Sequence, residues 1–178
     1  MIMDKKVLRK EVRARIAAIA DELKQQKSTM LALALVVHPA VRSARVVALF
    51  SPLDDEPSIG EVISVLSQEH IVVLPRVEGE KMEFYPFAEA AMHKGAYGIM
   101  EPGEGVPVAA ADIDVMIVPG VAFTADGVRM GRGKGYYDKY MSQAGFKART
   151  IAVCYEEQLL PSLPCEPHDV RVDEVLSR

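Results

Sequence analysis

A glycine-rich stretch about two-thirds along the chain has the residue types needed to bind a phosphate. In GRGKGYYD, residues 131–138, three glycines alternate with Arg132 and Lys134, and two tyrosines and an aspartate follow. Glycines let the backbone approach an anion closely and point its N–H groups at it, while the two cations supply full charge. The stretch lies between the apolar run DVMIV and a helical pattern. Ligands of open α/β sheets bind outside the carboxyl ends of the strands, and helix starts favour anions, so this position indicates a phosphate-rich ligand.

The stretch matches neither of the two common nucleotide-binding motifs. A P-loop needs a glycine six positions before its lysine, but Val128 stands six positions before Lys134, and Gly135 follows where Ser or Thr belongs. The dinucleotide fingerprint fails as well, because the final G-x-x-G spacing is missing. On spacing alone, a surface loop without a ligand stays an open alternative.

Asp138 is the first candidate metal ligand. It falls in the first turn of the expected helix, where a carboxylate suits an Mg²⁺ ion that is also bound by the phosphates of a nucleotide. The simpler interpretation is an ordinary first-turn acid that the helix dipole favours.

The rest of the chain predicts an α/β protein with a largely parallel sheet covered on both faces, because strand patterns alternate with helix patterns. The first helix carries apolar residues at helical spacing, a possible N-cap at Asp4 and a basic opposite face. Gly145 is expected just past the end of the helix that follows the glycine stretch. The expected helices cover residues 4–20, 21–37, 59–70 and 135–145, and the expected strands lie within 44–52, 71–77, 81–87, 112–120, 149–155 and 168–177.

Composition limits the function classes. The 178 residues predict one domain, 1–178, with 49% hydrophobic and 26% charged residues. A net charge of −4 argues against a nucleic-acid partner, and the apolar run at 30–41 is too short to span a membrane, so we interpret it as a buried helix end. Two cysteines cannot form a disulfide scaffold, and Cys154 in IAVCY is expected to be a buried apolar residue. We therefore expect a cytoplasmic protein, monomeric or weakly dimeric.

Four segments together resemble the 5-formyltetrahydrofolate cyclo-ligase family, whose activity is also called methenyltetrahydrofolate synthetase. GVAFTADGVRMGRGKGYYDKY closely resembles the signature of the family. The N-terminal KKVLRKEVRAR is similar to its basic helix, SPLDDEPS to a loop with a glutamate, and HDVRVDEVLS to its C-terminal block. The resemblance spans nearly the whole chain, and it is loose over residues 76–113.

This resemblance implies a fold, a reaction and two cofactors. The fold is a three-layer α/β/α sandwich of the sugar-phosphate isomerase and CoA-transferase type. The reaction converts 5-formyltetrahydrofolate, possible polyglutamates included, to 5,10-methenyltetrahydrofolate, and it requires ATP and Mg²⁺. Phosphoryl transfer to the formyl oxygen makes that oxygen a leaving group, after which N10 closes the ring; such chemistry needs mainly positioning and charge neutralisation.

The resemblance also assigns roles to residues of this sequence. The catalytic set is Lys134, Arg132 and Tyr136. Asp138 and Asp173 are the implied Mg²⁺ ligands. The implied ATP contacts are Lys5, Arg9, Arg129, Met130, Gly131, Arg132, Gly133, Lys134, Gly135, Tyr136 and Tyr137. Lys5 and Arg9 lie four apart and therefore share a helix face, although a solvated basic stripe would look the same.

On the folate side, Glu56 is the implied pterin contact, because a carboxylate can accept two hydrogen bonds from an amino-pyrimidine edge. Asp55 is the alternative, since this loop varies in length within the family. Phe50 and Tyr85 could pack on the ring or simply face the core, and His168 is expected to be structural. The implied folate contacts are Phe50, Glu56, Arg132, Gly133, Lys134, Gly135 and Tyr136.

Three other functions remain as alternatives. A homologue could bind folate or nucleotide without turnover, and the complete GRGKGYYD set argues against this without identifying a folate pocket. A sugar-phosphate or CoA-handling enzyme of the same broad fold is disfavoured by the basic helix and paired tyrosines. Nucleic-acid binding is weaker still, because no aromatic and basic surface pattern appears.

Overall fold

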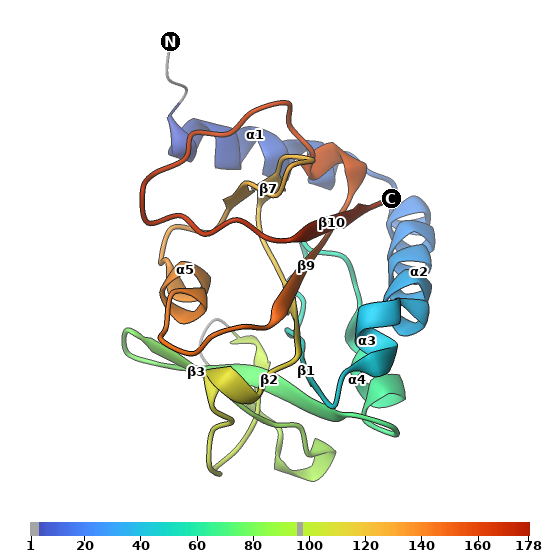
Figure 1. The fold of residues 1–178 in the computed structure, drawn as a ribbon. Coiled ribbons are helices and arrows are strands. Elements are labelled where there is room, and N and C mark those ends of the chain that lie inside the picture. Colours follow the sequence, from blue (N-terminus) through green and yellow to red (C-terminus); the bar gives the residue numbers. More distant parts are fainter. Residues whose placement is uncertain (1–3, 96–97) are drawn as a thin grey trace.

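The computed structural model describes residues 4–95 and 98–178 and shows three layers (Figure 1). The helices are α1 (Lys5–Ala17), α2 (Asp21–Val37), α3 (Pro39–Ser43), α4 (Gly60–Leu66) and α5 (Tyr136–Met141), with short 3-10 turns η1 (Glu89–Ala91), η3 (Ala110–Asp112) and η4 (Glu156–Gln158). Helices α2, α3 and α4 cover one face of the central sheet, and α5 covers the other. This arrangement confirms the predicted α/β class.

The central sheet has six strands in the order β10-β9-β6-β1-β2-β3. Five strands run parallel to their neighbours, and β3 pairs antiparallel with β2 through a hairpin. These strands are β1 (Val46–Ala48), β2 (Ile71–Glu78), β3 (Lys81–Pro86), β6 (Val115–Val118), β9 (Arg149–Cys154) and β10 (Glu174–Ser177). Two small antiparallel pairs complete the set, β4 (His93–Lys94) with β5 (Met100–Glu101) and β7 (Ala122–Phe123) with β8 (Arg129–Met130).

Alternate residues of the central strands feed two separate cores. Val47 and Ile117 pack beneath α2 and α4, whereas Ala48 and Met116 face α5. Because both faces are covered, the parallel strands are apolar throughout, as the continuous runs in the sequence indicate.

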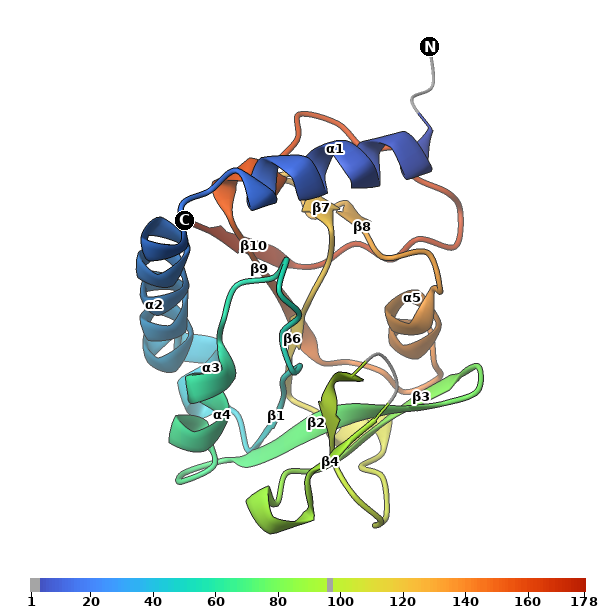
Figure 2. The ribbon, with the colours of Figure 1, turned by 180° about the vertical axis from the view of Figure 1, so that it is seen from behind.

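Helix α1 lies across the carboxyl end of the sheet rather than on either face (Figure 2). Its apolar residues Leu8, Val12 and Ile16 form a third cluster with Met130 and Tyr155, beside the β7–β8 hairpin. Asp4 caps the helix, accepting a hydrogen bond from the Lys6 N–H at 2.8 Å, as predicted. Lys5, Arg9 and Arg13 flank this apolar stripe and line the cavity at the edge where the strands end, whereas Lys6 and Lys10 point to solvent.

The last strand expected within 168–177 is confirmed as β10, which begins at Glu174. Two other local expectations were wrong. Helix α5 ends at Met141, so Gly145 lies beyond its cap, although it has a positive φ of 85°. The end of α2 is half-buried, because Leu31 and Leu35 face the core while Leu33 and Val37 are exposed.

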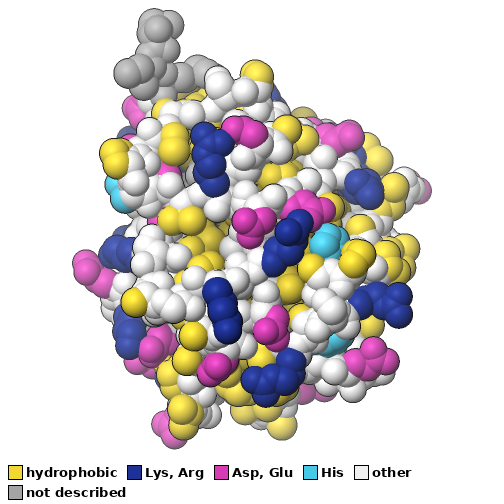
Figure 3. Space-filling model, viewed as in Figure 1, with side chains coloured by type: hydrophobic (Ala, Val, Ile, Leu, Met, Phe, Trp, Pro, Cys, Tyr) yellow, Lys and Arg dark blue, Asp and Glu magenta, His cyan; other side chains and the backbone are white. Residues whose placement is uncertain are grey.

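Within the described residues, the helices are all too short or too polar to cross a lipid bilayer. The face in Figure 3 shows basic and acidic side chains interspersed, and no continuous basic patch extends over it. This face therefore has no basic stripe along which the phosphates of a nucleic acid could bind.

Candidate functional site

A cavity of about 690 Å³ opens at the carboxyl edge of the sheet, between α1, α5 and the loop after β1. This is the size and place typical of ligand sites in α/β proteins. The sequence-predicted residues that line it are Lys5, Arg9, Phe50, Glu56, Arg129, Met130, Gly131, Arg132, Gly133, Lys134, Gly135, Tyr136, Tyr137 and Asp138. Segments far apart in the sequence therefore meet around one space.

The glycine stretch takes a conformation that needs glycine at two positions. Gly133 and Gly135 have φ values of 105° and 69°, in the left-handed region that residues with a Cβ rarely adopt. The β7–β8 hairpin leads into the stretch, and Gly135 is the N-cap of α5. Helix α5 has only six residues, so its dipole adds little, and the backbone N–H groups and cations must provide most of any anion binding.

The basic face of α1 contacts the glycine stretch directly. Arg9 donates from Nε to the carbonyl of Gly131 at 2.8 Å. One turn earlier, Lys5 pairs with Asp169 at 2.8 Å and with Glu166 at 3.4 Å. Burial disfavours the charged form of Lys5, but these carboxylates outweigh it and raise its pKa. Lys5 and Arg9 thus border the cavity together, as their spacing predicts.

Lys134 differs from the other cations of the site. Its side chain is exposed at the cavity mouth, and it has no hydrogen-bond or ion-pair partner within residues 4–95 and 98–178. Arg129, Arg132 and Lys5 are instead held by carboxylates. Lys134, and Arg9 with its bond to the Gly131 carbonyl, are therefore the described cations of the cavity that an incoming anion can reach without displacing an acid.

Arg129, Tyr137 and Asp138 form a buried unit at the base of the cavity. Arg129 is 6% exposed, donates to Asp138 at 2.8 Å and to the Pro119 carbonyl at 3.2 Å, and lies over the Tyr137 ring at 5.6 Å. Burial, reinforced by the negative charge of Glu56, raises the pKa of Tyr137 well above its ordinary value, so this phenol stays protonated. The second oxygen of Asp138 accepts the Val170 N–H at 3.1 Å.

Glu56 lies deep in the loop after β1 and is 6% exposed. It accepts hydrogen bonds from the Leu53 N–H at 3.0 Å and from Arg132 at 2.8 Å. Burial raises the pKa of the Glu56 carboxyl despite the charge of Arg132. Phe50 is also buried and lines the same cavity, so its lining offers both a carboxylate and an aromatic ring.

Three sequence expectations do not reach the cavity. Asp173 accepts hydrogen bonds from the Thr150 N–H and hydroxyl at 2.7 and 2.9 Å and lines a separate, shallow depression, so the structure does not bring it together with Asp138. Tyr85 is buried beneath Arg76, which lies 3.9 Å above its ring. Asp55 lies just outside the lining residues and pairs with Arg132 and Arg13.

The structure also adds residues that the sequence reasoning missed. Arg13 lines the cavity one turn after Arg9, and the four-residue spacing was a usable signal. Asp169 and Glu166 come from the C-terminal segment and hold Lys5, a role that no local pattern indicates. His168, expected to be structural, lies exposed on the cavity rim, 3.1 Å from Glu166.

Comparison with known proteins agrees with this geometry. Residues 1–178 match the 5-formyltetrahydrofolate cyclo-ligase family. The 5-formyltetrahydrofolate cyclo-ligase of Mus musculus is 30% identical, over 97% of this chain and 92% of its own.

Two solved structures are similar as well. The 5,10-methenyltetrahydrofolate synthetase of Aquifex aeolicus superimposes with a TM-score of 0.89 at 34% identity, over 98% of this chain and 90% of its own. The synthetase of Mycoplasma pneumoniae shares the fold, with a TM-score of 0.76 at 24% identity over 97% and 98% of the two chains. The match along the whole chain, together with a cavity lined by its signature residues, shows that this protein belongs to the 5-formyltetrahydrofolate cyclo-ligase family.

Proposed function

We propose that this protein, as one domain over residues 1–178, uses ATP to convert 5-formyltetrahydrofolate to 5,10-methenyltetrahydrofolate, with release of ADP and phosphate. The observation that carries the proposal is the convergence, in one cavity, of the glycine stretch and the basic face of α1 with Glu56 and Phe50. The glycine stretch and α1 suit a triphosphate, whereas Glu56 and Phe50 suit a flat amino-pyrimidine ring.

The chemistry follows from the poor electrophilicity of an N-formyl group. The formyl oxygen attacks the γ-phosphorus of ATP and ADP leaves. N10 of the folate then attacks the activated carbon and gives up its proton to water or to the departing phosphate, and the oxygen departs as inorganic phosphate. Charge builds on the transferring phosphoryl group, so the main requirements are fixed geometry and nearby positive charge.

The glycine stretch and α1 supply that charge. Lys134 is an exposed cation of the cavity lining with no ion pair among the described residues, and Arg132 lies on the wall, so both can face the reacting oxygens. Lys5 and Arg9 hold the ATP from the helix side, and backbone N–H groups around Gly133 and Gly135 face the phosphates. Tyr136 is anchored by its hydroxyl, which donates to the Gly79 carbonyl at 3.0 Å, and it closes the wall beside the formyl group.

The folate lies against the opposite wall. Glu56 accepts hydrogen bonds from the pterin edge, and Phe50 packs on the ring, while Pro75 and Val77 extend the apolar surface. Glu56 and Phe50 are buried and Pro75 and Val77 are half-buried, so this wall shields the activated carbon from water, which would otherwise hydrolyse it.

The donor set fits Mg²⁺ with one protein carboxylate. Asp138 lines the cavity and would hold the ion beside the phosphates if its Oδ2 is shared with or released from Arg129, while its Oδ1 accepts the Val170 N–H. The ion supplies neutralisation of phosphate charge. Asp173 lines a separate depression and bonds to Thr150, so it does not fit this role in the conformation shown.

A direct assay tests the proposal. Purified protein with Mg-ATP and 5-formyltetrahydrofolate should produce the methenyl compound, seen as rising absorbance with an equal release of ADP. In the control without ATP, the absorbance of the methenyl compound should not rise. Binding of the folate without turnover would instead support a homologue that has lost the reaction.

Three finer points belong to the same proposal. We place the enzyme in the cytoplasm, where both free cysteines would stay reduced. We propose a monomer or weak homodimer, to be checked by sedimentation at several concentrations. The cavity opens to solvent at the glycine stretch, which leaves room for a polyglutamate tail on the substrate.

A further inference from the structure

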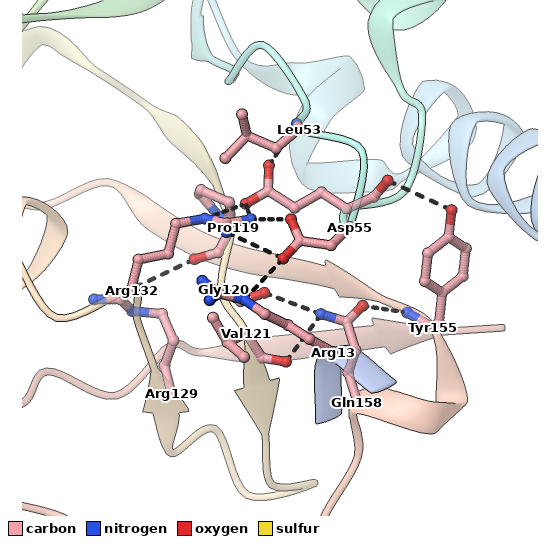
Figure 4. A network of polar contacts seen from close by, with 11 residues as sticks. Arg13, Leu53, Asp55, Pro119, Gly120, Val121, Arg129, Arg132, Tyr155 and Gln158 are labelled. Carbon is pink, nitrogen blue, oxygen red and sulfur yellow. Dashed lines mark hydrogen bonds and ion pairs between the residues drawn. The ribbon is translucent and has the colours of Figure 1, made fainter. Parts of the chain in front are cut away.

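The Arg132 guanidinium is almost fully occupied. Its Nε donates to Glu56 at 3.3 Å, its Nη1 to Asp55 at 3.1 Å, and its Nη2 to both carboxylates (Figure 4). A guanidinium has five N–H donors, so one donor of Nη1 remains for a ligand. Arg132 is thus held on two sides by acids of one loop.

Asp55 has a second cationic partner on a different element. Arg13 of α1 donates from Nε to the same carboxylate at 3.2 Å. Asp55 therefore joins α1, the loop after β1 and the glycine stretch, as Figure 4 shows from close by. Burial opposes its ionisation, but the hydrogen bond and charge of Arg132 prevail and hold the pKa of Asp55 below its ordinary value.

Glu56 has a conflict of roles. Its carboxylate lies in the cavity wall, is almost inaccessible and now accepts hydrogen bonds from Arg132. If it is to accept hydrogen bonds from a pterin edge, it must release at least part of Arg132. A released guanidinium needs another acid to keep it in place, because a charge left unpaired at a half-buried position is costly.

Asp55 meets that need. It contacts Arg132 through both carboxylate oxygens, which is the two-point arrangement that fixes the plane of a guanidinium. It does not line the cavity itself, so it can hold Arg132 without contacting the substrate. Arg13 fixes Asp55 in turn.

We propose that Asp55 is a positioning residue, which holds Arg132 at the cavity wall while the carboxylate of Glu56 turns to the folate. Without Asp55, Arg132 keeps Glu56 as its acidic partner and competes with the substrate for it. The inference rests on the proposed function for the identity of the ligand, but the hold on Arg132 is independent of it.

The adjacent Asp54 is a matched control. It has the same charge, lies in the same loop, is exposed, and has no ion pair among the described residues. Asp54→Asn changes the net charge as Asp55→Asn does, but it leaves the hold on Arg132 intact.

The first test measures the hold without any ligand. Trypsin cuts after Arg132 and after Lys134, and initial rates at the two bonds are followed by mass spectrometry on the folded full-length protein. A paired guanidinium is protected, so Asp55→Asn should raise cleavage after Arg132 about threefold relative to cleavage after Lys134. Asp54→Asn should leave the ratio of the two cleavage rates unchanged. Asp55→Glu should bring that ratio most of the way back to the wild-type value, because it keeps a carboxylate. An unchanged ratio in Asp55→Asn, or an equal rise at both bonds, overturns the proposal.

The second test measures the consequence for the substrate. By calorimetry, Asp55→Asn should weaken binding of 5-formyltetrahydrofolate about tenfold, because Arg132 then competes with the folate for Glu56. ADP binding should change by less than about twofold, because the Arg132 side chain itself is retained. If Asp55→Asn raises the cleavage ratio but leaves the folate affinity unchanged, then Asp55 holds Arg132 without freeing Glu56 for the folate, and that part of the proposal is overturned. If the wild-type protein binds no folate while the ratio still rises, the proposed function fails and the hold on Arg132 stands.

Discussion

The guanidinium of Arg129 lies 2.8 Å from the carboxylate of Asp138, and their side chains are only 3% and 12% exposed. Arg129 comes from β8 and Asp138 from α5, so this ion pair ties the two ends of the glycine stretch together. The stretch is therefore a loop closed at its base, and the atoms that we propose to face the phosphates are held by a buried contact.

Removing Arg129 should destabilise the fold strongly. Arg129→Met leaves Asp138 as an unpaired, nearly buried charge, which should lower the free energy of unfolding by about 3 kcal/mol. Urea denaturation followed by circular dichroism measures this. The control is Arg171→Met, which breaks the exposed pair with Asp126 and should change stability little. Equal losses in the two variants would contradict the structural role of Arg129.

Gly127 should not tolerate a side chain. A Cβ there would lie 2.2 Å from the Val172 carbonyl oxygen, and φ is 90°. Gly127→Ala should therefore lower the free energy of unfolding by about 2 kcal/mol or more, because backbone must shift in addition to the strain at positive φ. Gly60→Ala is the control, since a Cβ at Gly60 meets nothing within 4 Å. A harmless Gly127→Ala would show that the contact with Val172 is wrongly placed.

Lys134 should matter for turnover and not for folding. Lys134→Ala removes an exposed cation of the cavity lining, and kcat should fall about 100-fold or more, as is typical when a group that faces developing charge is lost. The melting temperature should stay unchanged, because Lys134 is exposed and has no ion pair within the described residues. Lys139→Ala, an exposed lysine on α5 outside the cavity lining, should leave kcat as it is. Normal turnover in Lys134→Ala would remove Lys134 from the reaction.

The two cysteines should differ in reactivity. Burial, with a smaller contribution from Glu156 and Glu157, raises the pKa of Cys154 to about 12, whereas Cys165 is exposed. A thiol reagent such as DTNB should therefore modify Cys165 quickly in the native protein and Cys154 only after denaturation. Cys165→Ser should abolish the fast reaction. Fast labelling of native Cys165→Ser would show that Cys154 is accessible.

Asp114 should make the fold sensitive to acid. Its carboxylate accepts hydrogen bonds from the N–H groups of Val46 and Arg45 at 2.9 and 2.8 Å. The bond from Val46, more than any other contact, lowers the pKa of Asp114 from 3.8. A lowered pKa stabilises the fold above pH 3.8, and that stabilisation is lost as the pH falls through the folded value.

At pH 7, Asp114→Ala should therefore cost about 1 kcal/mol, a modest value because solvent screens this exposed group. The difference from wild type should shrink as the pH falls below 3.8. Denaturant titrations at several pH values test this, with Asp112→Asn as the control, because Asp112 lies near it without such a bond among the described contacts. A difference that is independent of pH would rule out the carboxylate as its source.

Much of the fold could be predicted from local pattern. The second helix begins at Asp21 and ends at Val37, as the apolar spacing and the following proline indicate. The buried strands β6 and β9 lie within the apolar runs at 112–120 and 149–155. Helix and strand periodicities are properties of a few consecutive residues, so they can be read without knowing the partners.

The candidate site divides in the same way. The sequence by itself determined the chemistry of the glycine stretch, since Gly133 and Gly135 must adopt backbone angles that other residues resist. The sequence did not determine which acids pair with the cations of the site. Nor did it determine that Asp173 bonds to Thr150, away from the cavity. Asp55 and Arg132 lie 77 positions apart, and Lys5 and Asp169 lie 164 apart. Such pairs depend on how the strands are ordered and on where α1 crosses their ends, and only the tertiary structure decides that.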